Sequence, residues 1–171
     1  GDNKKEKGRR RRQAEALRKI LRLKAKIGEE KLVEIEPGLF LSGIGAAYNL
    51  NELQRVGVSH IVTVSDSISP KFPQRFEYKI IPIKDSSDAA EEMSKALKDI
   101  YEFIESARGS GGKVLVHCFR GKSRSPTVVC FVLMKRHSWN VERAMSLIRQ
   151  KAKAVSPNSG FMKILEEFEK A

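Results

Sequence analysis

The sequence lacks the features that would place it in a membrane, disulfide-rich or metal-binding class. Its longest strongly apolar run, Val128 to Met134, is far shorter than the roughly 20 residues that cross a bilayer, so no transmembrane segment is expected. The chain has two cysteines, Cys118 and Cys130, and no Cys or His spacing indicates a metal site. No secretory signal or internal repeat is visible. These absences leave the class of globular proteins, and a length of 171 residues is enough for one globular domain with a charged extension.

Positive charge is concentrated at one end of the chain. Residues 1–31 hold 13 Lys and Arg against 5 Asp and Glu, whereas residues 32–171 hold 20 against 16. The basic residues thus belong mainly to an N-terminal tail, which argues against a nucleic-acid-binding fold. Within this tail, residues 1–12 are polar and are expected to be disordered. Residues 13–27 are expected to form an amphipathic helix that stops at Gly28.

The compact domain is expected to cover residues 32–171, where short apolar stretches alternate with helix-prone ones. Strands are expected at 32–36, 39–41, 60–64, 76–83 and 113–116. Helices are expected at 46–55, 91–107, 126–136, 141–152 and 161–170. This alternation predicts an α/β fold, in which helices cover both faces of a sheet.

The most informative segment is the loop from His117 to Ser125, with the sequence HCFRGKSRS. It joins a predicted strand to a predicted helix, for which Ser125 is a suitable N-cap and Pro126 a suitable first residue. Backbone amides are unpaired at a helix start, and the positive end of the helix dipole lies there. The loop therefore predicts a phosphate cradle that holds Cys118 as a thiolate nucleophile.

Other positions of the loop fit the same chemistry. Arg124 has a planar fork that matches two phosphate oxygens and can hold the phosphoryl group through its transition state. Gly121 lets the backbone curl around an anion. The Ser125 hydroxyl can donate to the Cys118 sulfur and help the thiolate leave. His117 is expected to point away from the pocket and to fix the loop by hydrogen bonds, rather than to act as an acid or base.

The reaction also needs an acid that protonates the leaving oxygen. We assign Asp85, because it follows a predicted strand and lies on a polar loop that can close over the cradle. Asp88, three residues further on, is the second candidate. The same carboxylate would then activate the water that hydrolyses a phosphocysteine.

The sequence resembles the dual-specificity phosphatases of the cysteine-dependent protein tyrosine phosphatase superfamily, and it looks nearest to plant and MAP-kinase phosphatase members. The resemblance is carried by Lys113–Thr127, Ile83–Asp85 and Ser156–Phe161, and it covers about residues 32–170. It implies a central, mostly parallel sheet of about five strands flanked by helices. It also implies hydrolysis of phosphotyrosine and phosphoserine or phosphothreonine with no metal and no cofactor.

Carried over to this chain, the resemblance makes Cys118 the nucleophile, Arg124 the phosphate clamp, Asp85 the general acid and Ser125 the residue that assists the leaving thiolate. The family's acid usually precedes the cysteine by about thirty residues. Asp85 precedes Cys118 by 33 residues and Asp88 by 30, so both stay open. The residues expected to bind substrate are Phe119, Arg120, Gly121, Lys122 and Ser123.

Two further features leave alternatives open. Arg120 and Lys122 add positive charge to the loop, so the substrate could also be a phosphoinositide or a phosphoglycan. Asn158 is expected to cap the last helix, and it is a candidate to buttress the active loop. A phosphopeptide-binding scaffold on the same fold is a third alternative, although it would not need both Cys118 and an acid after the strand.

The tail has several interpretations. It can be a solvated charge run that keeps the protein in solution. The basic cluster Arg9–Arg12, followed by Leu21 and Leu23, resembles a docking motif for a MAP kinase. A basic amphipathic helix also resembles a calmodulin target or a membrane-surface segment, and the arginines resemble a nuclear import signal. Because a free catalytic thiol requires a reducing compartment, the expected location is the cytosol or the nucleus.

Overall fold

The computed structural model describes residues 2–171. Its elements are, in order, α1 (Asp2–Gly28), β1 (Val33–Glu36), β2 (Leu39–Ser42), α2 (Ile44–Ala47), α3 (Leu50–Val56), β3 (His60–Val64), β4 (Glu77–Ile81), the 3-10 helix η1 (Ser87–Ala89), α4 (Ala90–Gly109), β5 (Val114–His117), α5 (Arg124–His137), α6 (Val141–Lys151) and α7 (Ser159–Glu169). One expected helix is split in two: the helix expected at 46–55 is α2 and α3, because the Asn49 side chain caps a new helix by accepting from the amide of Glu52.

The strands form a five-stranded sheet in the order β1-β2-β5-β3-β4. β1 pairs antiparallel with β2, and all the other pairs are parallel. The predicted α/β fold with a mostly parallel sheet is confirmed. In this order β5 is central, and β3 lies beside it. The carboxyl ends of these strands meet at one edge of the sheet, where α/β proteins form their binding sites.

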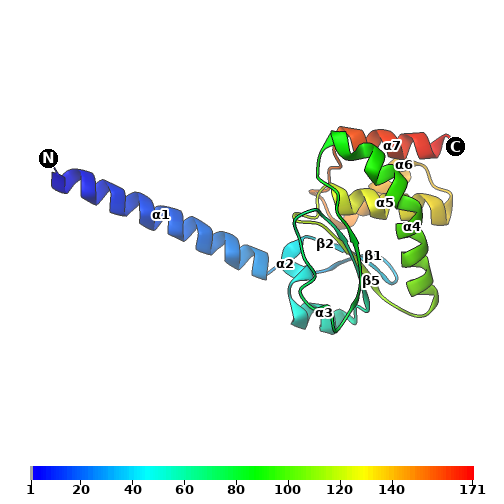
Figure 1. The fold of residues 1–171 in the computed structure, drawn as a ribbon, viewed down its shortest axis with the longest axis horizontal. Coiled ribbons are helices and arrows are strands. Elements are labelled where there is room, and N and C mark those ends of the chain that lie inside the picture. The colour runs from blue at the N-terminus through cyan, green and yellow to red at the C-terminus, as the bar shows by residue number, and fades with distance from the viewer. Residues whose placement is uncertain (1) are drawn as a thin grey trace.

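Helices cover both faces of the sheet (Figure 1). Alternate strand residues point to opposite faces. Phe40, Ile61 and Leu115 share one buried cluster with Leu53 of α3. The other face carries a larger cluster to which α4, α5, α6 and α7 contribute. In α5, every residue from Arg124 to Met134 is buried, so the helix that follows the cysteine loop is the central helix of this layer. Cys130 is one of these buried residues, and both cysteines are free, as expected.

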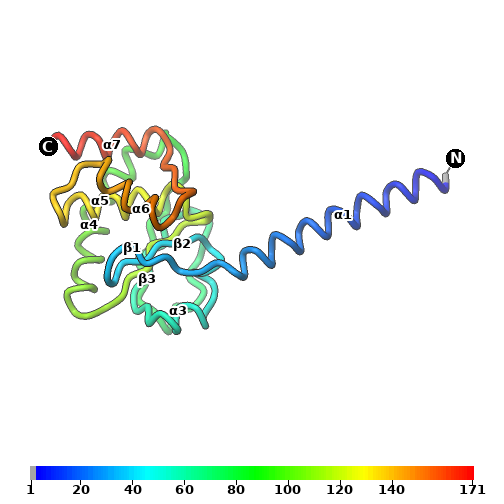
Figure 2. The backbone as a smooth tube through the Cα atoms, turned by 180° about the vertical axis from the view of Figure 1, so that it is seen from behind, coloured from blue at the N-terminus to red at the C-terminus, as the bar shows by residue number. Residues whose placement is uncertain are grey.

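The helix α1 projects from the rest of the protein, and its first turn lies at the opposite end of the molecule from the C-terminus (Figures 1 and 2). The expectation of disorder before residue 13 is wrong for residues 2–12, which belong to α1; Gly1 lies outside the described residues. Lys, Arg, Glu and Gln are good helix formers, and a Glu6–Arg10 pair with an N–O distance of 2.7 Å adds support one turn apart. The helix ends at Gly28, as predicted.

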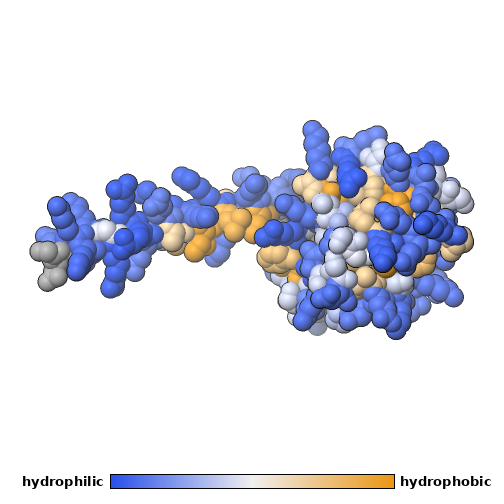
Figure 3. Space-filling view, turned by 90° about the horizontal axis from the view of Figure 1, so that it is seen from above, coloured by the Kyte–Doolittle hydropathy of each residue, from blue (hydrophilic) through white to orange (hydrophobic). Residues whose placement is uncertain are grey.

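The apolar residues of α1 are not covered. They gather on the half of the helix next to the globular part (Figure 3), and Leu17, Ile20, Leu21, Leu23 and Ile27 are all exposed. Among the described helices, none is both long and apolar enough to cross a membrane. An exposed apolar stripe on a basic helix is typical of a surface that binds a partner.

Candidate active site

The loop after β5 lies at the carboxyl edge of the sheet and leads directly into α5. Cys118 is 2% exposed, and its Sγ lies 3.1 Å from the Ser125 hydroxyl. The expectation that Ser125 caps α5 is wrong, as is the placement of Pro126 at the first helical position. The helix begins at Arg124, two residues earlier than expected, with Ser123 at its N-cap position. Ser125 therefore lies in the first turn, where its hydroxyl contacts the sulfur.

The outer side of the loop is held by hydrogen bonds from neighbouring segments. The carbonyl of Phe119 accepts from the amide of Ile44 at 2.9 Å, and the carbonyl of Lys122 accepts from Ser156 at 2.7 Å. The Ser123 hydroxyl accepts from the amide of Asn158 at 3.0 Å. Gly121 has φ of +71°, and a Cβ there would lie 2.8 Å from the backbone of Ser42, so this turn requires glycine.

The amides of the loop are unpaired. Within residues 2–171, the backbone N–H groups of residues 119–123 donate to no protein acceptor. Five consecutive amides without a protein acceptor are free to bind a ligand. A row of them beside a thiol and a helix N-terminus is suited to surround an anion.

Arg124 follows this loop as the first residue of α5, and one nitrogen of its guanidinium is already bound. Its Nη1 donates to the carbonyl of Ile83 at 3.1 Å and to the Ser65 hydroxyl at 3.2 Å. The same atom lies 3.6 Å from Oδ1 of Asp66. In the described part of the chain, Nε and Nη2 have no acceptor. The free edge can therefore grip two oxygens of a phosphate.

Ser65 and Asp66 were missed by the sequence reasoning. They follow β3, the strand beside β5, so their place at the shared carboxyl edge was a usable signal. Their contacts with Arg124 hold the guanidinium at Nη1.

His117 is buried and forms a hydrogen bond with the backbone of the loop, which agrees with the expectation that it fixes the loop. Its Nδ1 lies 3.3 Å from the carbonyl of Cys118, and its Nε2 lies 2.8 Å from the hydroxyl of Thr63. A carbonyl can only accept, so Nδ1 carries the proton and Nε2 accepts from Thr63. Burial lowers the pKa of His117 to about 4, against a smaller opposing contribution from the Cys118 carbonyl. The imidazole is therefore neutral near neutral pH.

The two candidate acids lie on the segment between β4 and α4. Oδ1 of Asp85 accepts from the side-chain amide of Asn158 at 3.0 Å. Asp88 lies in η1, and its side chain has no polar partner in the described chain. Ser87 is bound to the start of α7, because its hydroxyl lies 2.9 Å from that of Ser159 and accepts from the amide of Gly160.

Asn158 joins the acid loop to the cysteine loop. Its side-chain oxygen caps α7 by accepting from the amide of Phe161 at 2.9 Å, as predicted. Its backbone amide holds Ser123, and its side-chain amide holds Asp85. The structure thus brings Asp85, rather than Asp88, into contact with a residue that supports the loop.

The remaining predicted residues form the mouth of the site. Phe119 is 49% exposed, and the side chains of Arg120 and Lys122 are exposed as well. Residues 2–171 contain no group of three or more His, Cys, Asp and Glu arranged to hold a metal ion.

A buried cysteine in a loop of free amides, between a parallel strand and a helix that starts with arginine, defines the class of cysteine-dependent phosphatases. Comparison with known proteins places the chain within this class. It belongs to the dual specificity phosphatase family, whose catalytic domain matches residues 39–171, and it is a phosphatase hydrolase.

Individual relatives agree with this placement. The chain is 39% identical over 144 residues to dual specificity protein phosphatase 1B of Arabidopsis thaliana. The matched region covers 84% of this chain and 85% of the relative. It is 41% identical over 137 residues to MAP kinase phosphatase with leucine-rich repeats protein 3 of Dictyostelium discoideum, covering 80% of this chain and 16% of that protein. The solved structure of human tyrosine phosphatase-like serine/threonine/tyrosine-interacting protein has a TM-score of 0.77 at 31% identity, covering 82% of this chain and 96% of that one.

Proposed function

We propose that residues 32–171 form a catalytic domain that hydrolyses phosphotyrosine, phosphoserine and phosphothreonine through a phosphocysteine intermediate. The observation that supports this most is the row of unpaired amides around Cys118, opposite the free edge of Arg124. In the first step the Cys118 thiolate attacks phosphorus, and the bond from phosphorus to the substrate oxygen breaks. Asp85 gives its proton to that oxygen, while Arg124 and the loop amides hold the three remaining phosphate oxygens.

In the second step the ionised Asp85 takes a proton from water, and the water oxygen attacks phosphorus. The bond from sulfur to phosphorus breaks, and the Ser125 hydroxyl, 3.1 Å from the sulfur, donates to the departing thiolate. Neutral His117 keeps the loop in place through Thr63 and the Cys118 carbonyl. No metal or cofactor takes part in these steps.

The proposal is tested by turnover of an aryl phosphate by the full chain at neutral pH. Cys118→Ser should lower turnover at least about 10⁴-fold, and should retain the substrate as a stable complex. Cys130→Ser is the matched control, because this thiol is buried in α5 and burial raises its pKa to about 12. Full activity in Cys118→Ser, or a requirement for a divalent metal, would contradict the mechanism.

A second candidate substrate is a phosphoinositide or phosphoglycan, and the exposed Arg120 and Lys122 at the mouth favour it. Phosphate release from doubly and singly phosphorylated peptides should be compared with release from inositol phospholipids. Faster release from the lipids would make the polyanionic substrate the better proposal. Tight phosphopeptide binding with negligible turnover would favour a phosphopeptide-binding scaffold instead.

We further propose that α1 recruits the substrate, and that a MAP kinase is the partner. The relative from Dictyostelium discoideum is named a MAP kinase phosphatase. In α1 a basic cluster, Arg9 to Arg12, precedes exposed Leu21 and Leu23, which fits a partner surface that is acidic and grooved. Calmodulin is the alternative partner for the same helix. For either partner the proposed location is the cytosol or the nucleus, where a free thiol stays reduced.

The recruitment proposal is tested with Leu21→Asp/Leu23→Asp, two changes at exposed positions of α1 that leave the catalytic residues untouched. The variant should lose affinity for a MAP kinase while it hydrolyses an aryl phosphate like the wild type. Lys4→Ala/Lys5→Ala is a control on the same helix outside the cluster. Calcium-dependent calmodulin binding that the leucine changes abolish, with no kinase binding, would replace the kinase by calmodulin.

A further inference from the structure

The C-terminal end of α1 lies against α2 (Figure 1). The carbonyl of Ile27 accepts from the amide of Glu30 at 3.2 Å. A Cβ on Gly45 of α2 would overlap that carbonyl and would lie 2.9 Å from Cγ2 of Ile27. The contact therefore depends on glycine at position 45, and it fixes the last turn of α1 on α2.

The carboxylate of Glu30 binds the start of α2. Its Oε1 accepts from the amides of Gly43 and Ala46, each at 3.0 Å. Hydrogen bonds from amides to a carboxylate are among the stronger ones in proteins. A single side chain just beyond α1 thus sets the position of the backbone from Gly43 to Ala46.

The same backbone supports the outer side of the cysteine loop. Ile44 donates its N–H to the carbonyl of Phe119 at 2.9 Å. A Cβ on Gly43 would lie 2.8 Å from that carbonyl oxygen, and a Cβ on Gly121 would lie 2.8 Å from the backbone of Ser42. Two backbone segments are therefore in direct contact with no side chain between them. Because such close packing leaves no free space, a shift of one segment displaces the other.

We propose that Glu30 is a positioning residue for the cysteine loop, and that it transmits the placement of α1 to the catalytic centre. This inference rests on the proposed function, since it takes the loop to be the phosphate site. Residues 3–28 of α1 are exposed except for the half-buried Gly8, so a partner can bind α1 along its length, and one that pulls on its last turn acts on Glu30. The partner would then change the affinity of the loop for phosphate as well as bring the substrate near.

The first experiment compares Glu30→Ala, Glu30→Gln and the wild-type full chain. Binding of inorganic phosphate is measured by calorimetry, and kcat and KM are measured with an aryl phosphate. Loss of the two hydrogen bonds that Oε1 accepts from Gly43 and Ala46 should weaken phosphate binding roughly 10-fold in Glu30→Ala. The effect should appear mainly in KM, because Asp85 and Arg124 are held by Asn158 and Asp66 on the other side of the pocket. Glu30→Gln keeps an acceptor oxygen and should stay within about 2-fold of the wild type.

Glu29→Ala is the matched control, since Glu29 is the exposed neighbour of Glu30 and should bind phosphate like the wild type. The second experiment uses Gly45→Ala, which displaces Ile27 and leaves Glu30 itself intact. It should weaken phosphate binding in the same direction, and thermal unfolding is measured to show that the variant is folded at the assay temperature. This variant keeps the proposal testable even if Glu30→Ala does not fold.

Wild-type phosphate affinity in a folded Glu30→Ala variant would overturn the positioning role. An equal loss in Glu30→Gln and Glu30→Ala would do so as well, because the charge rather than the contact would then matter. An unchanged affinity in Gly45→Ala would overturn transmission from α1. Failure of the proposed function looks different: the wild type would bind phosphate normally and hydrolyse nothing.

Discussion

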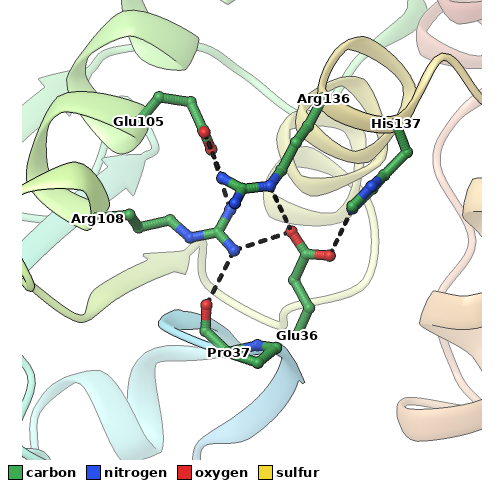
Figure 4. A network of polar contacts seen from close by, with 6 residues as sticks. All are labelled: Glu36, Pro37, Glu105, Arg108, Arg136 and His137. Carbon is green, nitrogen blue, oxygen red and sulfur yellow. Dashed lines mark hydrogen bonds and ion pairs between the residues drawn. The ribbon is translucent and has the colours of Figure 1, made fainter.

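The two ends of α5 carry polar clusters of opposite design. At its N-terminus, the cysteine loop presents unpaired amides and an arginine with a free edge. At its C-terminus, Arg136 and His137 enter a network with Glu36, Glu105 and Arg108 (Figure 4). Arg108 alone donates to Glu36, Glu105 and the Pro37 carbonyl, each at 2.9 Å. One cluster has open positions for a ligand, and the other is closed on itself.

The electrostatics of the second cluster follow from this closure. Burial raises the pKa of Glu36, but hydrogen bonds and charges from His137 and Arg108 outweigh burial and leave the pKa below its ordinary value. Cations at a helix C-terminus also complement its dipole. The comparison shows that a dense group of charges stabilises the fold when every charged group in it is paired. A site for chemistry is marked by the groups that the fold positions and leaves unpaired.

The largest expected effect is at the open cluster. Asp85→Asn should lower turnover roughly 10²–10⁴-fold, because it removes the proposed proton donor to the leaving oxygen. Asp88 is not expected to replace it, since Asp85 is the acid that contacts Asn158. The loss should shrink for aryl phosphates whose leaving group needs little protonation. Steady-state rates with a series of phenols check this, and Asp88→Asn is the matched variant. A large loss in Asp88→Asn with none in Asp85→Asn would reverse the assignment.

The closed cluster should respond in stability instead. Arg108→Ala removes the hydrogen bonds to Glu36, Glu105 and the Pro37 carbonyl, while Arg136 and His137 stay paired with the two half-buried carboxylates. The loss should be about 1–3 kcal/mol of unfolding free energy. Urea unfolding measures the loss, while kcat and KM with an aryl phosphate should be unchanged well below the melting temperature. A fall in kcat with unchanged stability would remove the distinction between the two ends.

The titration of His117 should make the stability of the folded protein depend on pH. Its pKa is about 4 in the folded protein and near 6.5 when unfolded, so between these values the unfolded chain binds more protons. Stability should therefore fall as pH drops from about 6.5 to 4, and this group contributes up to about 3 kcal/mol of the fall. His117→Gln should flatten this part of the profile. Equal slopes in both proteins, measured by urea unfolding at each pH, would contradict the assignment.

The smallest effect is expected at the ion pair between Asp66 and Arg124 in the open cluster. Asp66→Asn removes a half-exposed charge 3.6 Å from Arg124, and it should weaken phosphate binding about 3-fold. Asp66→Glu should restore part of the affinity, and Asp99→Asn on α4 is an exposed control. Inhibition by phosphate measures the change. No difference between Asp66→Asn and the control would show that Ser65 and the Ile83 carbonyl orient Arg124 without it.

The parts of the site that sequence reasoning found are local. Cys118 and Arg124 are six residues apart, within one loop whose flanking strand and helix have clear periodicity. The choice between Asp85 and Asp88 could not be made from spacing, since it depends on Asn158, which is 73 residues from Asp85. The helix content of residues 2–12 was also missed, because composition was read as disorder where side-chain propensity favoured a helix.

The sequence alone determined the order of strands and helices along the chain, the cysteine loop and the basic amphipathic character of residues 13–27. Each of these is encoded by neighbouring residues. Tertiary structure decided the rest. The contacts of Glu30 with α2, of Asp66 with Arg124 and of Asn158 with both loops join residues far apart in sequence. Such contacts depend on how the strands and helices pack, and no local pattern of side chains records them.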